Sequence, residues 1–207
     1  MPVKRAGRVV LIHGARFKKA DHENLRRLAV GFRATGFSVV FPTYGYLPAL
    51  VIGLFQWLDR RIADSMAGFI TEDDILVGHS NGGTLVYLIS QQVKLRGAVL
   101  INPALDSKLV PRAGFVHVYY NAGDILTRLS ALVPFHCWGD MGAIGYTGLD
   151  GRVRNFDQSN TPGLPSLTGH ADVFKHGNVR LWGRFMAERC LESLEKLKST
   201  KWGNCHD

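Results

Sequence analysis

The chain has 207 residues, of which 46% are hydrophobic and 20% are charged, a composition that excludes a disordered protein. This length suits one compact domain, and we expect a single domain over residues 1–207 because no repeat or linker interrupts the sequence. The formal net charge of +8 comes from scattered Lys and Arg residues with few aromatic neighbours, so we expect solvated faces and no nucleic-acid partner.

No segment predicts a membrane span or a signal peptide. The longest apolar stretch, residues 47–58, is too short for the ~20 residues that cross a bilayer, and the basic start leads into a short apolar run that ends at His13. The cysteines are Cys137, Cys190 and Cys205, an odd number without a CxxC pair. This pattern favours a reducing compartment, and we expect a cytoplasmic protein.

Continuous β-branched runs predict strands that are buried on both faces. They occupy residues 8–14, 37–42, 74–80, 97–103 and 115–124. Segments with helical periodicity lie between them, at 22–36, near 55–70 and at 82–94. This alternation predicts an α/β fold, a three-layer α/β/α sandwich around a mainly parallel sheet.

The pattern is looser after Asp124. The Asp150-Gly151 turn signal predicts a hairpin or a last strand near 152–157. Residues 159–174 are rich in turn formers and predict a loop, and residues 179–199 form an amphipathic pattern that predicts a closing helix.

A G-x-S-x-G motif, Gly78-His79-Ser80-Asn81-Gly82, lies between a predicted strand and a predicted helix. Taken alone, the motif is a weak signal, and a serine in an ordinary turn is the alternative. The context is that of a nucleophile elbow, in which a strained serine is flanked by small residues so that strand and helix can approach each other. Gly78, Gly82 and Gly83 are small in this way.

With this motif the chain resembles the α/β-hydrolase superfamily over nearly all of its length, as a small esterase-like or lipase-like member. That family presents a serine, an acid and a histidine in this chain order. The resemblance implies that Ser80 is the nucleophile and that His170, in the loop before the last helix, is the base. It also implies that Asp124, after the strand at 115–124, orients that base.

Other residues compete for two of these roles. His136 and His176 remain alternatives for the base, whereas His79 is set aside because side chains diverge next to the nucleophile in such a turn. The alternatives for the acid are Asp106, Asp140 and Asp157.

Acyl transfer also requires two N–H donors for the oxyanion. One would be the backbone N–H of Asn81, directly after the nucleophile. The family takes the other from a turn after an early strand, which His13-Gly14-Ala15 resembles, so the donor would be the Ala15 N–H.

The family usually inserts a cap domain before the strand at 115–124, and residues 104–114 leave no room for one. Substrate contacts must then come from the core and its loops. Leu47, Leu50 and Leu54 belong to an apolar segment, residues 44–58, that forms either a helix packed on the sheet or a wall for the acyl group. An open groove without a lid predicts a preference for acyl chains of about two to six carbons.

The sequence therefore predicts a capless serine hydrolase, in the first place a carboxylesterase, that acts on a small-molecule ester. Thioester and amide bonds would use the same groups. No metal or organic cofactor is implied, because protein groups supply the nucleophile, the base and the donors. The alternative from another class is a non-catalytic binding protein that keeps the same scaffold.

Overall fold

The computed structural model describes residues 6–14, 20–44, 56–132 and 137–203. Its six strands form one sheet in the order β2-β1-β3-β4-β5-β6, and every neighbouring pair is parallel. The strands are β1 (Gly7–Ile12), β2 (Phe37–Val40), β3 (Asp74–His79), β4 (Gly97–Ile101), β5 (Val116–Tyr120) and β6 (Val153–Asp157).

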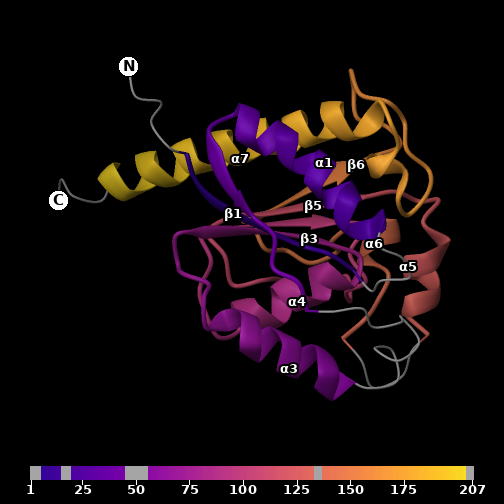
Figure 1. The fold of residues 1–207 in the computed structure, drawn as a ribbon, viewed down its shortest axis with the longest axis horizontal. Coiled ribbons are helices and arrows are strands. Elements are labelled where there is room, and N and C mark those ends of the chain that lie inside the picture. Colours follow the sequence, from indigo (N-terminus) through magenta and orange to yellow (C-terminus); the bar gives the residue numbers. More distant parts are fainter. Residues whose placement is uncertain (1–5, 15–19, 45–55, 133–136, 204–207) are drawn as a thin grey trace.

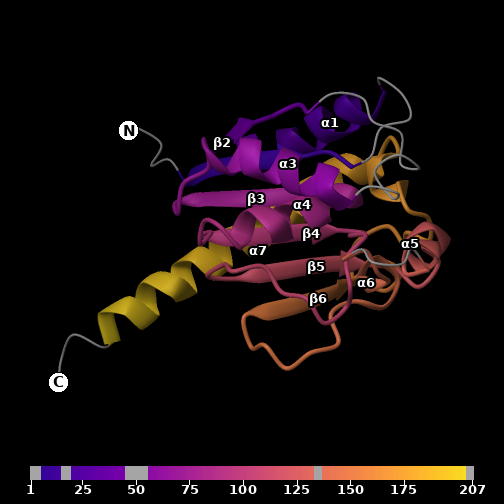
Figure 2. The same ribbon diagram turned by 90° about the horizontal axis from the view of Figure 1, so that it is seen from below.

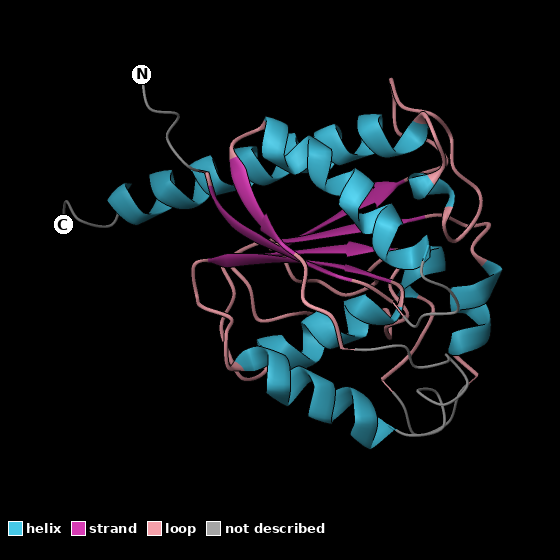
Figure 3. Ribbon diagram, in the orientation of Figure 1, coloured by secondary structure: helices cyan, strands magenta, loops and turns pink. Residues whose placement is uncertain are grey.

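Helices cover both faces of this sheet, which confirms the predicted three-layer sandwich (Figures 1 and 3). Helices α1 and α7 lie together on one face, and α3 and α4 lie on the other. The helices are α1 (Ala20–Ala34), α3 (Gln56–Ala67), α4 (Asn81–Ser90), α5 (Ile125–Ser130), α6 (Met141–Ile144), the 3₁₀ helix η1 (Asp172–Phe174) and α7 (Asn178–Gly203).

The continuous apolar runs of the sequence reflect burial on both faces of the sheet. In β1, Val9 and Leu11 belong to the cluster under α1 and α7, whereas Val10 and Ile12 belong to the cluster under α3 and α4. Successive residues of a strand point to opposite faces, so nearly every residue of a doubly covered strand is apolar. This requirement makes the strand recognisable from its sequence.

The structure resolves the choice at residues 152–157 in favour of a last strand. Strand β6 pairs in parallel with β5, with Val153 opposite Val116 and Asp157 opposite Tyr120, so no hairpin forms there. The Asp150-Gly151 turn instead leads the chain back to the amino end of the sheet. The short helices α5 and α6 were not expected from the sequence, because so few residues carry no helical period.

The candidate site lies at the carboxyl edge of the parallel strands, where ligands bind in open α/β sheets. Figure 2 shows α5 and α6 beyond this edge, next to the ends of β4 and β5. No helix formed by the described residues has the length and the apolar character needed to cross a membrane.

Candidate active site

Ser80 occupies a strained turn between the end of β3 and the start of α4. Its backbone angles, φ 56° and ψ −126°, lie in a region that residues other than glycine rarely adopt. Hydrogen bonds on both sides hold this conformation: the Ser80 N–H donates to Ile101 O at 3.0 Å, and its carbonyl accepts from Gly83 at 2.9 Å and from Ala104 at 3.1 Å. The backbone strain that the motif predicts is present at this residue.

The glycines around Ser80 are required by close contacts. A Cβ on Gly78 would overlap the carbonyl of Gly82, and a Cβ on Gly82 would overlap the carbonyl of Ile12. A Cβ on Gly83 would lie only 2.6 Å from Pro103 Cβ. The strand β3 and the helix α4 can therefore meet at Ser80 only because these positions lack side chains.

The structure brings Asp124 and His170 together. Nδ1 of His170 lies 2.8 Å from Oδ2 of Asp124, whose side chain is fully buried. The same carboxylate accepts hydrogen bonds from Asn102 Nδ2 at 3.0 Å and from the Thr127 N–H at 3.2 Å, as the N-cap of α5. Burial would raise the pKa of Asp124, but the hydrogen bond and charge of His170, with the other two donors, hold it below its ordinary value.

The loop that carries His170 is fixed against the loop that carries Asp124. A Cβ on Gly123 would overlap the carbonyl of Thr168, so only glycine allows this approach. Within the His170 loop, Oδ2 of Asp172 accepts from the N–H groups of Thr168 at 3.2 Å and Gly169 at 2.8 Å. The position of the imidazole is therefore determined by backbone contacts on both sides.

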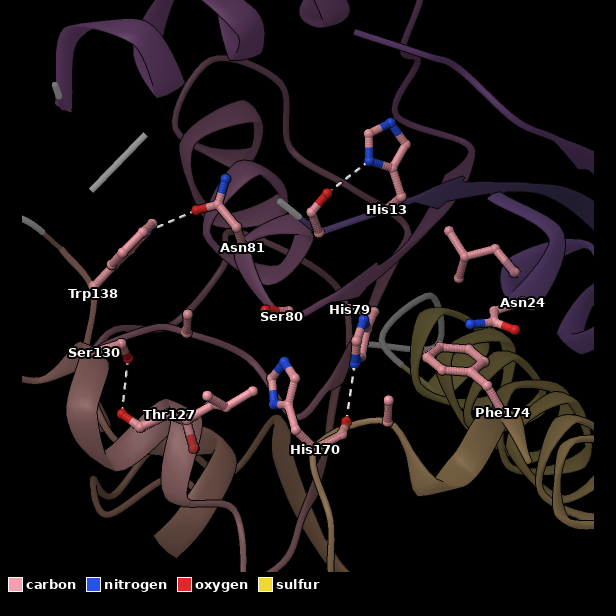
Figure 4. Close-up of a pocket in the computed structure, with 15 residues that line it drawn as sticks. His13, Asn24, His79, Ser80, Asn81, Thr127, Ser130, Trp138, His170 and Phe174 are labelled. Atoms are coloured by element: carbon pink, nitrogen blue, oxygen red, sulfur yellow. Dashed lines mark hydrogen bonds between the residues drawn. The ribbon is translucent and has the colours of Figure 1, made fainter. Parts of the chain in front are cut away.

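Ser80 and His170 line the same cavity, which has a volume of about 310 Å³. Figure 4 shows the imidazole of His170 next to Ser80, with Trp138 and Phe174 on opposite sides of the serine. No hydrogen bond joins these two described residues directly, and such bonds often tighten only when a substrate is bound. The other lining residues are His13, Gly14, Asn24, Leu25, His79, Asn81, Ala104, Leu126, Thr127, Ser130 and Ala171.

His79, which sequence reasoning set aside, also lines the cavity. Its Nε2 lies 3.1 Å from the carbonyl oxygen of His170, and the two rings are 4.9 Å apart. Burial, helped by the charge of His170, lowers the pKa of His79 to about 3, so the ring is neutral and its Nε2–H donates to that carbonyl. His79 thus supports the loop of His170 and offers no free base.

The competing residues lie elsewhere or are not described. His176 is exposed and is not among the residues that line the cavity, and His136 lies outside the described residues. Asp106 is exposed, and Asp157 accepts hydrogen bonds from the backbone and hydroxyl of Ser159. Asp140 precedes α6 at its N-cap position. The carboxylate bonded to His170 is that of Asp124.

The residues predicted for the oxyanion and the substrate are only partly described. Asn81 is the first residue of α4, where backbone N–H groups have no acceptor within the helix. Ala15, Leu47, Leu50 and Leu54 lie outside the described residues. The preceding Gly14 is close to the nucleophile, since a Cβ on it would lie 2.8 Å from Ser80 Cβ.

The side chain of Asn81 belongs to a buried network that sequence reasoning missed. Its amide nitrogen donates to Asp59 Oδ1 at 3.0 Å, and its amide oxygen accepts from Trp138 Nε1 at 2.7 Å. The three residues come from α4, α3 and the loop before α6, so no local spacing in the sequence connects them. Within the described ranges, no three side chains of the types that commonly bind metals gather in one place.

No protein-family model matches the sequence, and a search of curated proteins finds no relative. Solved structures with a similar fold include a CIB-like hydrolase from Thermoplasma acidophilum, with a TM-score of 0.56, 14% identity and coverage of 93% of this chain and 89% of that one. The esterase domain of a Rhodothermus marinus protein has a TM-score of 0.54 and 11% identity, with coverage of 92% of this chain and 89% of that one. Esterase B from Lactobacillus rhamnosis has a TM-score of 0.53 and 16% identity, with coverage of 97% of this chain and 81% of that one. The described sheet and its covering helices agree with these structures, and the chain has the α/β-hydrolase fold.

Proposed function

We propose that the protein is a serine hydrolase that cleaves esters through an acyl-enzyme on Ser80. The observation that carries this proposal is the hydrogen bond between the buried Asp124 and His170, which lines the same cavity as Ser80. A nucleophile, a base and a group that orients the base are thereby collected at one end of the sheet. Two of the similar solved structures are esterases, which agrees with this proposal.

Each group has a defined role in the proposed reaction. Because Nδ1 of His170 donates to Asp124, Nε2 carries the lone pair and takes the proton of Ser80 as its oxygen attacks the carbonyl carbon. The tetrahedral intermediate collapses when the imidazolium returns that proton to the leaving alcohol. Water then attacks the acyl-enzyme with the help of the same base and releases the acid and free Ser80.

Asp124 keeps His170 in the required tautomer. Its lowered pKa means that the carboxylate is ionised throughout the neutral range and stabilises the imidazolium as it forms. Asn102 and Thr127 also donate to this carboxylate and hold its orientation toward the ring.

The backbone N–H of Asn81, at the start of α4, is the first proposed donor for the oxyanion. It follows Ser80 directly, and one such donor is worth ~3 to 4 kcal/mol of transition-state stabilisation. The second proposed donor is the N–H of Ala15, after Gly14, whose backbone passes close to Ser80.

The proposed substrate is a small-molecule ester with a short acyl chain. A cavity of about 310 Å³, at the lower end of the usual range for ligand sites, suits a small group. Thioesters and amides require the same nucleophile and base, and the similar solved structures include a thioesterase domain as well as esterases. We also propose a cytoplasmic location, on the basis of the cysteine pattern.

Hydrolysis of p-nitrophenyl butyrate by four proteins tests this function. Ser80→Ala and His170→Ala should each lose nearly all activity because these groups act as a unit, whereas the exposed control His176→Ala should keep the wild-type rate. Wild-type turnover that survives in Ser80→Ala would contradict the proposal. Absence of turnover on esters, thioesters and amides would favour a non-catalytic binding protein.

A further inference from the structure

We propose that Trp138 is a specificity-determining residue that limits the size of the acyl group, and that the buried pair Asn81 and Asp59 holds its indole in place. The inference rests on the proposed hydrolase function and goes beyond it, because it names the wall that selects among substrates. It is carried by the hydrogen bonds of the Asn81 side chain and by the contacts of the loop around Trp138.

The three side chains form a chain of hydrogen bonds directed toward a buried carboxylate. Trp138 Nε1 donates to Asn81 Oδ1 at 2.7 Å, and Asn81 Nδ2 donates to Asp59 Oδ1 at 3.0 Å. Asp59 is fully buried in the first turn of α3, and Asn81 is 1% exposed. Hydrogen bonds that run in one direction along such a chain polarise and strengthen one another.

This arrangement permits one orientation of the amide. If the Asn81 side chain were flipped, its NH₂ group would face the indole N–H and its carbonyl would face the carboxylate, so that both hydrogen bonds would be lost. The carboxylate of Asp59 accepts only, and the indole of Trp138 donates only. The position of the indole edge therefore follows from the position of Asp59.

The backbone on both sides of Trp138 is fixed as well. The Asp106 N–H donates to Cys137 O at 2.9 Å, and Ser130 Oγ donates to Gly139 O at 2.8 Å. A Cβ on Gly139 would overlap Asp106 Cα, so the loop lies directly against the segment after β4. With its backbone and its N–H both held, the indole is a rigid surface of the cavity.

Trp138 lies where a fixed wall affects the substrate. It lines the cavity together with Ala104 and Leu126, and its hydrogen-bond partner Asn81 directly follows Ser80 in the chain (Figure 4). Asn81 therefore links the two: its backbone adjoins the nucleophile Ser80, and its side chain holds the indole of Trp138. An acyl chain held at Ser80 meets the indole when it exceeds the space in front of it, and a chain that does not fit there loses about tenfold or more in kcat/KM.

Selectivity across p-nitrophenyl acetate, butyrate, hexanoate and octanoate tests the inference. In Trp138→Ala, the ratio of kcat/KM for octanoate to that for acetate should rise by about tenfold relative to wild type, and in Trp138→Phe, which keeps an aromatic ring, by only a few fold. Asp59→Ala should shift the ratio in the same direction, and Asp59→Asn, which keeps an acceptor oxygen, should restore most of the wild-type ratio. The matched controls are Trp57→Phe and Asp64→Ala, both exposed positions on α3.

A uniform change of all four rates in Trp138→Ala, or Asp59 variants that alter the melting temperature without altering the ratio, would overturn the inference. The function itself would still stand if Ser80-dependent hydrolysis remained. Calorimetry gives the same comparison without turnover. It measures the binding of p-nitrophenyl butyrate and p-nitrophenyl octanoate to the Ser80→Ala variant and to the Ser80→Ala, Trp138→Ala double variant. Trp138→Ala should raise the affinity for the octanoate ester relative to that for the butyrate ester. An unchanged ratio of the two affinities would also overturn the inference.

Discussion

Nδ1 of His170 lies 2.8 Å from Oδ2 of Asp124, although 46 residues separate them in the sequence. The pair joins the loop after β5 to the loop before α7, and Gly123 allows the two loops to touch. The carboxylate is fully buried, and the imidazole lies between it and the cavity. A positive charge that forms on the imidazole is therefore stabilised by the buried carboxylate behind it.

Asp124→Asn tests the role of this carboxylate. The amide keeps the shape of the side chain but can donate to Nδ1, which leaves the proton on Nε2, the position needed as the base. We expect kcat to fall on the order of 10⁴-fold. The melting temperature should also fall, because the new amide group faces Asn102 Nδ2, which donates to the same oxygen in the wild type. The control Asp157→Asn should keep its rate, and the opposite result for the two variants would assign the acid to Asp157.

Gly14→Ala tests the contact between the β1 loop and the nucleophile. A methyl group there would lie 2.8 Å from Ser80 Cβ and 2.9 Å from His79 O, so the serine must shift. A displacement of ~1 Å in an active site costs about 100-fold in rate, and we expect a loss of that order in kcat/KM. Gly68→Ala is the control, because its nearest neighbour, Ser65 O, is at 3.8 Å. Full activity in Gly14→Ala would mean that the β1 loop is not part of the site.

His117 predicts how stability depends on pH. Burial, together with the charges of Arg154 and Arg189, lowers its pKa in the folded protein to about 3, whereas an unfolded histidine titrates near ~6.5. Between these values the unfolded chain binds a proton that the folded protein does not. The free energy of unfolding should therefore fall as the pH drops through this window, by about 1.4 kcal/mol per pH unit from this residue.

Urea unfolding of wild type and His117→Gln between pH 4.5 and 6.5 measures this effect. The variant should show a flatter dependence on pH than wild type, and His176→Gln, an exposed control, should match wild type. Equal slopes in all three proteins would show that His117 is not neutral in the fold. Ordinary carboxylates contribute little in this window, because their pKa values lie near ~4.

The acyl-chain profile of the wild-type protein tests the openness of the site. We expect kcat/KM on p-nitrophenyl esters to peak at about two to six carbons, since a longer chain either meets the indole of Trp138 or leaves the cavity and gains little further burial. The rate should show no jump at the solubility limit of the substrate if, as the sequence predicts, no lid has to open. A maximum at long chains, or activation at a lipid interface, would contradict an open pocket.

The fold was predictable because its central strands are buried on both faces, whereas the edge strands β2 and β6 are partly exposed. Val9 and Val10 face opposite helical layers, so the apolar run of β1 is continuous, and the same holds for β3 and β4. Helices α5 and α6 were not predicted, since their positions follow from the N-cap at Asp124 and from loop contacts and not from a hydrophobic period.

The candidate site was predictable only where the backbone constrains the sequence. The glycines around Ser80 and before Asp124 are required by close approaches, and they leave a readable pattern. The bonds from Asn81 to Asp59 and to Trp138 link residues 22 and 57 positions apart and leave no such pattern. The contact of His79 with the loop of His170 leaves no such pattern either, because its partner is a backbone carbonyl of a distant loop.

Labelling with a fluorophosphonate tests the central claim most directly, since the probe reacts with a serine only where a base activates it. We expect the purified wild-type protein to be labelled once, on the peptide that contains Ser80, and we expect Ser80→Ala and His170→Ala to remain unlabelled while His176→Ala is labelled like wild type. Labelling that persists in Ser80→Ala, or a wild-type protein that does not react although it is folded, would contradict the assignment of Ser80 as the nucleophile.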